Sequence, residues 1–326
     1  MVVNKKTGLQ EFELIRWIQR QVGSSSHLTL GIGDDCSIQP QHAGQDLLTS
    51  TDLFIEGIHF KREWSNWYDL GRKAAAVNIS DIAAMGGTPQ SLYLGIGRPK
   101  DISDVEMEEF LSGFLAETGK YGAVLAGGDT CGSPGGLMIS VTVQGTVTAG
   151  EALCRQGASY GDAIYVSGSL GDSALALQLL QCGQQPDSGL VERFHTPTPQ
   201  VDLGQKLSKR QLATAMLDVS DGLLADLGHI LTASGVGAEL KMADLPLSQP
   251  FQKALQNDPG LIDLALAGGE DYELVFTSPL KDLAAQIDSP HTVTQIGVVS
   301  QKPGLRIHHP DGELYRCQRG GFDHFA

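Results

Sequence analysis

Apolar positions along the chain recur with two periods, which predict helices and strands in alternation. Spacings of three to four residues and Ala-rich runs predict helices at 11–21, 69–85, 105–120, 171–180 and 222–234. Alternating or short continuous apolar runs predict strands at 47–54, 91–97, 123–126, 137–147, 163–167, 213–217, 238–242, 272–277, 293–298 and 305–308. The interleaved order predicts a mixed α/β fold and disfavours a repeat array or a long coiled coil.

The length of the chain predicts two domains, because 326 residues exceed the usual size of one hydrophobic core. A stretch rich in Gly, Ala and polar residues at 148–162 is the candidate linker, and the strand and helix pattern starts again after it. We therefore expect an N-terminal domain at 1–150 and a C-terminal domain at 151–326. The segment PDSGLVERFHTPTPQ at 186–200 is predicted to be a surface connection.

The charge balance narrows the classes of partner. The chain has 23 Lys and Arg against 38 Asp and Glu, and its formal net charge is -15. Bare nucleic acid and anionic membranes are disfavoured as partners, because both are bound through clustered basic side chains. A small anionic substrate stays compatible with this charge if metal ions bridge it to the carboxylates.

The cysteines and the apolar runs indicate the compartment. Five cysteines are odd in number and widely spaced, with no CxxC pair, so disulfides and structural zinc are not expected. No run approaches the ~20 apolar residues of a membrane span. The first 20 residues lack the apolar run of a signal peptide. We expect a soluble protein of the reducing cytoplasm.

The loop GIGDDC at 31–36 sets two glycines beside the adjacent carboxylates of Asp34 and Asp35. Glycines let backbone N–H groups approach a polyphosphate, and carboxylates tolerate it when they hold metal ions. A loop that combines both suits a metal-bound nucleotide. The chain has no GxxxxGK[ST] motif, which excludes a Walker-type phosphate loop.

Further acidic and hydroxyl residues lie beside small residues at predicted strand ends and helix starts. Taken singly, each aspartate is most simply a helix cap or a turn residue, and Asp81 a buried hydrogen-bonding group. Taken together, oxygen donors without thiolate or imidazole favour Mg²⁺. The motifs NISD at 78–81 and DVSD at 218–221 share one pattern, through common origin or chance. The positions are Ser50, Thr51, Asp52, Asp81, Asp129, Asp218 and Asp221.

Seven motifs occur in a fixed order: GIGDDC, STD followed by GIHF, AVNISDIAAMGG, LAGGDT, LDVSDGLLADLGHI, LAGGEDYEL and the closing GGFDHFA. This order resembles the thiamine-monophosphate kinase family, within the aminoimidazole ribonucleotide synthetase superfamily. The resemblance runs from residue 12 to residue 325 and is most specific at GGEDYEL and at the closing motif. It implies a two-domain fold and a homodimer, with the N-terminal sheets forming a barrel-like interface and a C-terminal α/β domain alongside.

The resemblance also implies an activity and the residues that serve it. The γ-phosphoryl group of ATP would pass to thiamine monophosphate, giving thiamine diphosphate and ADP, with several Mg²⁺ ions. The N-terminal domain would bind ATP and Mg²⁺ and dimerise, and the C-terminal domain would complete the nucleotide and substrate site. By their match to the family motifs, the metal ligands would be Asp35, Ser50, Thr51, Asp52, Asp81, Asp129, Asp218 and Asp221. The nucleotide contacts are Tyr121, Gly128, Asp129, Arg155 and Ser220, and the substrate contacts are His59, Glu270 and the ring of Phe322.

This chemistry requires no catalytic side chain. A phosphate monoester has a second pKa near ~6, so its attacking oxygen is already anionic at neutral pH. The obstacle is repulsion between two anions, which bound metal ions reduce while they align the groups. Direct transfer without a protein nucleophile is therefore expected.

Two other classes remain open. Another ATP-using enzyme of the superfamily is one. An enzyme of the hydrogenase-maturation type needs a cysteine at its C-terminal end, whereas this chain ends DHFA with Cys317 upstream. An enzyme of the selenophosphate type needs a reactive cysteine near its N-terminus, and residues 1–30 contain no cysteine. A non-catalytic Mg-nucleotide or thiamine-phosphate binding protein is the other, and the full set of acidic residues weighs against it. ADP release with and without thiamine monophosphate would separate these classes.

Overall fold

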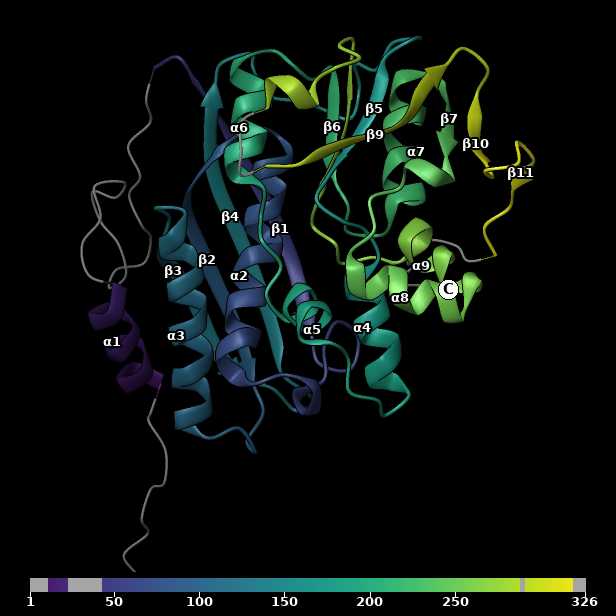
Figure 1. Ribbon diagram of the computed structural model, residues 1–326. Coiled ribbons are helices and arrows are strands. Elements are labelled where there is room, and N and C mark those ends of the chain that lie inside the picture. Colours follow the sequence, from purple (N-terminus) through teal and green to yellow (C-terminus); the bar gives the residue numbers. More distant parts are fainter. Residues whose placement is uncertain (1–10, 23–42, 288–290, 319–326) are drawn as a thin grey trace, which may run out of the picture. The chain divides into compact units, whose positions relative to one another are not determined.

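The computed structural model describes residues 11–22, 43–287 and 291–318, and Figure 1 shows its helices and strands. The chain divides into two compact units: Met1–Ile79 with Pro89–Thr146, and Ser80–Thr88 with Val147–Ala326. The short segment Ser80–Thr88 therefore belongs with the C-terminal half of the chain. Each unit combines helices with its own sheet, which confirms the predicted mixed α/β class.

The first unit has helices on one side of a four-stranded sheet and begins, in its described part, with an amphipathic helix (Figure 1). Helix α2 ends within the second unit, because its residues from Ser80 onward are assigned there. The elements are α1 (Glu11–Val22), β1 (Gln45–Ile55), η1 (Arg62–Trp64), α2 (Trp67–Ala84), β2 (Thr88–Arg98), α3 (Asp104–Lys120), β3 (Val124–Gly132) and β4 (Met138–Thr148).

The second unit has a seven-stranded sheet with more helices than the pattern of apolar residues predicted. Its strands are β5 (Ala163–Ser167), β6 (Ala215–Asp218), β7 (Gly237–Lys241), β8 (Leu274–Ser278), β9 (Val293–Ser300), β10 (Gly304–His308) and β11 (Leu314–Tyr315). Its helices are α4 (Asp172–Gln181), α5 (Ser188–His195), α6 (Val201–Lys209), α7 (Leu223–Ser234), α8 (Gln249–Asn257) and α9 (Ile262–Ala267), with short 3-10 turns η2 (Met242–Asp244), η3 (Pro259–Leu261) and η4 (Ala284–Gln286).

In the first unit the strand order is β1-β4-β2-β3, with β2 and β3 parallel. Helices α2 and α3 approach each other closely at two glycines. A Cβ at Gly71 would lie 1.9 Å from the carbonyl oxygen of Phe110, and one at Gly113 would lie 1.9 Å from that of Tyr68. These positions admit only glycine without a backbone shift, so the two helices pack at the minimum separation.

The opposite face of this sheet carries exposed apolar side chains. Strand β1 buries only Leu48 and Phe54, which are six residues apart and therefore on one face, and the side chains that point to the other face, from Leu47 to Leu53, are all exposed. Leu53 is 57% exposed and Leu47 43%, and Met138 on β4 is 46% exposed. No described residue of the same unit covers these side chains fully.

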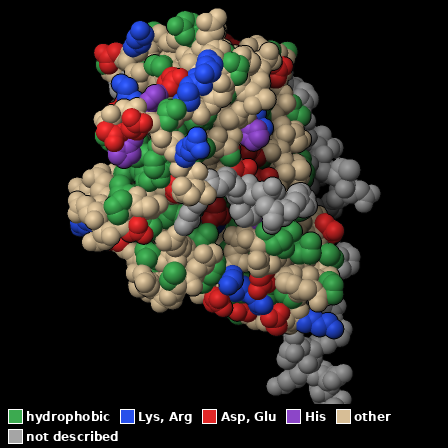
Figure 2. All heavy atoms as spheres, turned by 90° about the vertical axis from the view of Figure 1, so that its right-hand side faces the viewer, with side chains coloured by type: hydrophobic (Ala, Val, Ile, Leu, Met, Phe, Trp, Pro, Cys, Tyr) green, Lys and Arg blue, Asp and Glu red, His purple; other side chains and the backbone are tan. Residues whose placement is uncertain are grey.

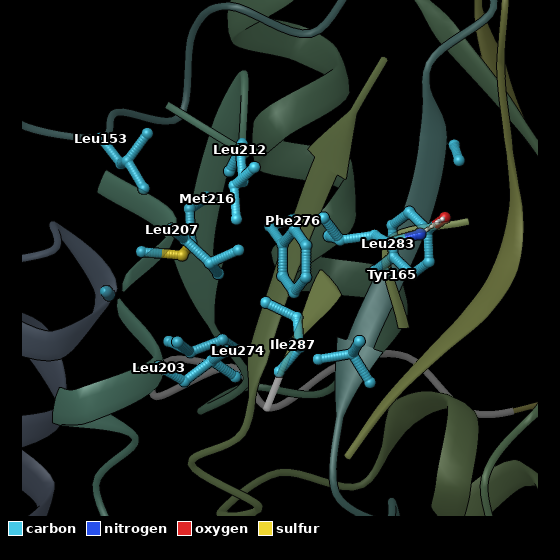
Figure 3. Close-up of a cluster of buried hydrophobic side chains, with 14 residues drawn as sticks. Leu153, Tyr165, Leu203, Leu207, Leu212, Met216, Leu274, Phe276, Leu283 and Ile287 are labelled. Carbon is cyan, nitrogen blue, oxygen red and sulfur yellow. Dashed lines mark hydrogen bonds between the residues drawn. The ribbon is translucent and has the colours of Figure 1, made fainter. Parts of the chain in front are cut away.

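The second sheet has the order β11-β10-β7-β9-β5-β8-β6 and is mostly antiparallel, with β7 and β10 parallel. Every residue of β5, β6 and β8 is buried. A core cluster covers this part of the sheet, where Tyr165 and Phe276 stack with ring centroids 5.5 Å apart (Figure 3). The central strands, and the loops that follow them, are therefore supported by a closely packed hydrophobic core.

Several predictions of local structure were wrong. The segment 186–200 is not a plain surface connection, because it contains α5, whose Leu190 and Phe194 are buried. Strand β3 does not end before Gly128 and Asp129 but continues through them to Gly132. Helices α6, α8 and α9 were not predicted; each is short, with six to nine residues.

Two further observations concern the hydrophobicity of the helices and the distribution of charge on the surface. No helix in the described ranges is long and apolar enough to cross a membrane. On the face drawn in Figure 2, Lys and Arg side chains lie scattered among Asp and Glu and form no continuous basic surface. This distribution follows the net charge of -15.

Candidate active site

Ser80 of the NISD motif and Asp218 of the DVSD motif meet within the second unit. The Ser80 hydroxyl, near the C-terminal end of α2, donates a 2.6 Å hydrogen bond to Asp218 Oδ2 at the end of β6. Asp218 is only 4% exposed. Asp81 follows Ser80 directly on α2 and is half-buried. The structure therefore brings Asp81 and Asp218 to one region, although 137 positions separate them in the sequence.

The turn after β6 is shaped by a buried carboxylate that the sequence analysis did not select. Asp226 Oδ2 accepts the backbone N–H groups of Ser220, Asp221 and Gly222 at 3.0, 3.0 and 3.1 Å. Burial, together with the charge of Asp221, raises the pKa of Asp226 to about 7. Because Asp226 occupies the amides at the start of α7, this turn offers its half-buried Ser220 and Asp221 side chains instead of an anion-binding nest.

The loop that carries Glu270 is joined to the same turn by backbone hydrogen bonds. The Glu270 N–H donates to the Ser220 carbonyl at 2.8 Å, and the Tyr272 N–H donates to the Val219 carbonyl at 2.8 Å. Glu270 and Tyr272 have φ values of 67° and 50°, in the left-handed region that disfavours side chains. The predicted substrate residue Glu270 and the predicted nucleotide residue Ser220 are therefore neighbours.

In the first unit, Ser50, Thr51 and Asp52 lie consecutively within β1. Neighbouring side chains of a strand point to opposite faces, so Thr51 points away from the face of Ser50 and Asp52. Its hydroxyl contacts the Val141 carbonyl at 3.2 Å and the Thr142 hydroxyl at 3.0 Å on β4. The three side-chain oxygens that the sequence groups together therefore do not converge.

Gly128 and Asp129 lie on β3, where they pair with Leu94 and Gly95 of β2. Both are exposed. A Cβ at Gly128 would lie 2.0 Å from the Leu94 carbonyl oxygen, so the close pairing of β2 and β3 requires glycine at this position. Asp129 lies on the last strand of this sheet, with its side chain exposed.

A hydrogen bond to Nδ1 defines the tautomer of the His59 ring. The Ile55 N–H donates to His59 Nδ1 at 3.0 Å. A nitrogen that accepts a hydrogen bond carries no proton, so the neutral ring bears its proton on Nε2. The ring lies 6.1 Å from that of Phe54, which stacks on Phe60 at 4.7 Å. His59 can donate from Nε2 while its ring stays oriented.

The remaining predicted residues lie in irregular positions or outside the described ranges. Tyr121 caps the C-terminus of α3 and is half-buried. Arg155 is exposed in the segment before β5, where its carbonyl accepts from the Ser234 hydroxyl at 3.4 Å. Asp35 and Phe322 lie outside the described residues.

The donor groups suit a hard cation in kind. No group of three His, Cys, Asp or Glu side chains within the described residues is arranged to hold a metal ion alone. The available donors are carboxylate and hydroxyl oxygens, which Mg²⁺ prefers. In the described part of the first unit, the buried Asn78 Oδ1 and Thr130 Oγ1 atoms lack a hydrogen-bond partner; Asn78 lies three residues before Asp81, and Thr130 directly follows Asp129. Such atoms fit a site that is completed by a ligand.

The chain matches the family described as AIR synthase related protein, with the N-terminal domain at 33–147 and the C-terminal domain at 159–310. Thiamine-monophosphate kinase of Escherichia coli is 39% identical over 326 residues, which are 97% of this chain and 98% of that protein. Thiamine-monophosphate kinase of Bacillus subtilis is 34% identical over 330 residues, 97% of this chain and 100% of that protein.

Solved structures are also similar to this chain. Thiamine-monophosphate kinase from Stenotrophomonas maltophilia K279a has a TM-score of 0.82 at 39% identity, covering 94% of this chain and 98% of that chain. AaThiL complexed with AMPPCP and TMP has a TM-score of 0.77 at 32% identity and covers 97% of both chains. Escherichia coli HypE, a hydrogenase maturation protein, has a TM-score of 0.74 at 19% identity, a likeness of fold alone.

Proposed function

The chain belongs to the thiamine-monophosphate kinase family of AIR synthase related proteins, and from this membership we propose that it phosphorylates thiamine monophosphate with ATP. The products are thiamine diphosphate and ADP. The observation that carries the proposal is similarity over 97% of the chain to proteins of that name, one of them solved with AMPPCP and TMP.

The metal ligands of this proposal are carboxylate, hydroxyl and backbone carbonyl oxygens. Mg²⁺, when bound, neutralises phosphate charge and aligns the reacting groups. The acidic side chains hold the ions, and Ser80 supports the site by fixing Asp218 Oδ2 through its hydrogen bond. The proposed ligands are Asp35, Ser50, Thr51, Asp52, Asp81, Asp129, Asp218 and Asp221, where Thr51 would contribute its backbone carbonyl because its hydroxyl contacts β4 on the other face.

We assign nucleotide binding to the backbone of β3 at Gly128 and to the cationic side chain of Arg155. Gly128 lets the polyphosphate approach β3, since no side chain projects from that position. Arg155, which is exposed in the segment before β5, supplies a positive charge for the phosphates. Ser220 and Tyr121 supply further contacts, with Ser220 held by the Asp226 carboxylate.

Thiamine monophosphate is bound by three groups of different chemistry. His59 donates from Nε2 to a phosphate oxygen, because its Nδ1 is occupied by the Ile55 N–H. Glu270 attracts the cationic thiazolium portion, and Phe322 offers a ring face for stacking. The attacking phosphate oxygen is anionic above a pKa of about 6, so no side chain acts as nucleophile or base.

The division of labour follows the two halves of the chain. The half at 1–150 binds ATP and Mg²⁺ and dimerises, and the half at 151–326 completes the nucleotide and substrate site. The homodimer buries the exposed Leu47, Leu53 and Met138 by pairing this sheet with that of a second copy, in a barrel-like interface.

The exposed thiols of Cys131, Cys154 and Cys182 fit the reducing cytoplasm, which is the compartment we propose.

A product assay tests this function. Purified protein is mixed with MgATP and thiamine monophosphate, and the products are resolved by chromatography. Thiamine diphosphate and ADP in equal amounts, both abolished by EDTA and by Asp35→Asn, support the kinase. Bound ATP that is never consumed would instead support a binding protein. ATP hydrolysis without thiamine diphosphate would indicate another acceptor.

A further inference from the structure

A buried polar cluster lies beneath the loop that carries Glu270. Arg193 on α5 directs its Nη2 atom at three oxygens: Glu273 Oε1 at 2.7 Å, and the carbonyls of Ser169 and Asp271 at 3.3 Å each. The Glu273 side chain is 2% exposed and that of Arg193 is 23% exposed. One guanidinium therefore bridges the segment after β5 and the segment before β8.

The same two segments are joined by further hydrogen bonds. The Asp271 carboxylate, also buried, accepts the Gly171 N–H with both oxygens, at 3.1 and 2.9 Å. The second carboxylate oxygen of Glu273 accepts from the Ser167 hydroxyl, and that hydroxyl accepts the Leu274 N–H at 2.9 Å. The Arg193 side chain thus completes a closed set of contacts around the loop.

The loop needs such contacts because its backbone is strained. Glu270 and Tyr272 both have positive φ, and Asp271 lies between them. Residues with side chains persist in this conformation only where surrounding groups fix it. Of the contacts described, Arg193 supplies the only cation, and it binds Asp271 through the main-chain carbonyl that separates the two strained residues.

We propose that Arg193 is a positioning residue for the acceptor substrate: by holding the Asp271 carbonyl and the Glu273 carboxylate, it fixes the backbone that presents Glu270 to thiamine monophosphate. The inference rests on the proposed function, because it takes Glu270 as the substrate contact. It adds a residue on α5, a helix that carries none of the predicted site residues. Arg193 touches no substrate and acts through Asp271.

The test compares three substitutions with a matched control. Arg193→Met removes the guanidinium, Arg193→Lys keeps the charge but not the three-way contact, and Arg193→Met with Glu273→Gln also removes the carboxylate left without its partner. The control is Arg306→Met, which breaks a second Arg–Glu pair, with Glu239, on strands β10 and β7 at the other side of the same sheet.

The readouts are kcat, the KM for each substrate, thermal unfolding and amide hydrogen exchange over residues 268–274. We expect Arg193→Met to raise the KM for thiamine monophosphate by about tenfold or more and to change the KM for MgATP far less. Arg193→Lys should lie between this variant and wild type. The double variant should regain thermal stability but keep the raised KM. Arg306→Met should leave both KM values unchanged.

Other results would overturn the proposal. A double variant with wild-type KM values would show that the ion pair is only structural. Parallel increases in both KM values would show a general effect on the unit. If wild-type protein makes no thiamine diphosphate, the proposed function fails, and hydrogen exchange alone then tests whether Arg193 positions the loop. Faster exchange at Glu270 and Tyr272 in Arg193→Met, but not in Arg306→Met, then supports the positioning role, and unchanged exchange contradicts it.

Discussion

The two units place their candidate site residues by different physical means. In the first unit, Asp52 and Asp129 lie on strands β1 and β3 and are exposed. In the second unit, Asp218, Asp221 and Glu270 lie at the end of a strand and in loops, where buried polar groups bind the backbone. Strand geometry orients the first set, whereas side-chain contacts orient the second.

This difference determines which changes each unit tolerates. A strand tolerates side-chain exchange on its open face but not a clash with its neighbouring strand. A loop held by buried carboxylates tolerates little change in those carboxylates, because Asp226 accepts three backbone N–H groups and Asp271 accepts the Gly171 N–H with both oxygens. Gly128 in the first unit and the buried acids Asp226 and Asp271 in the second are therefore informative positions to change.

The largest effect is expected at Asp218, at the end of β6. Asp218→Asn keeps the shape but removes a buried negative charge that accepts the Ser80 hydroxyl. We expect kcat/KM to fall by about 100-fold or more, because charge preorganised at the reacting groups is lost. Steady-state kinetics measures this, with Asp258→Asn, an exposed acid of the same unit, as the control. A loss below tenfold would show that Asp218 is not part of the charged site.

The steric counterpart in the first unit is Gly128→Ala. The new Cβ would lie 2.0 Å from the Leu94 carbonyl, so β2 and β3 must separate locally. We expect the free energy of unfolding to fall by about 1–3 kcal/mol, as for other overpacked sites. Gly132→Ala on the same strand is the control, since its Cβ meets nothing within 4 Å. Denaturant titration should separate the two variants, and equal stabilities would contradict the close pairing of these strands.

The buried Asp271 gives the second unit a pH dependence. Burial, with the charges of Asp172 and Glu273, raises the pKa of Asp271 well above 3.8, although the Gly171 N–H and Arg193 oppose this. The folded chain therefore holds this proton more tightly than the unfolded chain. The stabilisation is complete below pH 3.8 and is lost as pH rises toward the folded pKa.

Asp271→Asn should remove this component of the pH dependence. The difference in unfolding free energy between wild type and variant should change by at most about 1.4 kcal/mol per pH unit, the limit for one proton. Denaturant titrations at several pH values, without nucleotide or metal, measure it. Parallel pH profiles for the two proteins would show that Asp271 keeps an ordinary pKa.

The smallest effect on folding is expected on the open face of the first sheet. Leu53→Glu places a charge where Leu53 is already 57% exposed, so the unfolding free energy of a single chain should change by only about 0.5 kcal/mol. Its effect on assembly should be complete, with wild type sedimenting as a dimer and the variant as a monomer. Val105→Glu, at a 65% exposed position on α3, should leave the dimer intact. A monomeric wild type, or a dimeric Leu53→Glu variant, would contradict the proposed interface.

Local elements could be predicted where one period dominates the sequence. Helix α3 was expected at 105–120 and runs Asp104–Lys120, because Ser103 and Glu106 form a capping box at its start. Helix α5 was missed because Pro, Gly and Thr around it suggested a connection. Its Leu190 and Phe194, four residues apart and buried, were the available signal, together with Asp187 as N-cap.

The supporting groups of the site could not be predicted from periodicity. A pattern of apolar residues indicates which face is buried but not which distant segment supplies a polar partner. Arg193, Gly171 and Asp271 come from three separate stretches and meet only in the folded unit. Asp226 had a local signal, an acidic residue in the first turn of a helix that follows a glycine, yet its three amide contacts needed the structure.

We propose that the phosphoryl group passes from ATP to thiamine monophosphate in one step, with no protein nucleophile. The most direct measurement is the configuration at phosphorus after transfer from ATP that carries a chiral, isotopically labelled γ-phosphoryl group. A single in-line displacement predicts inversion in the thiamine diphosphate. Retention would require two displacements through a phosphorylated side chain and would contradict the account.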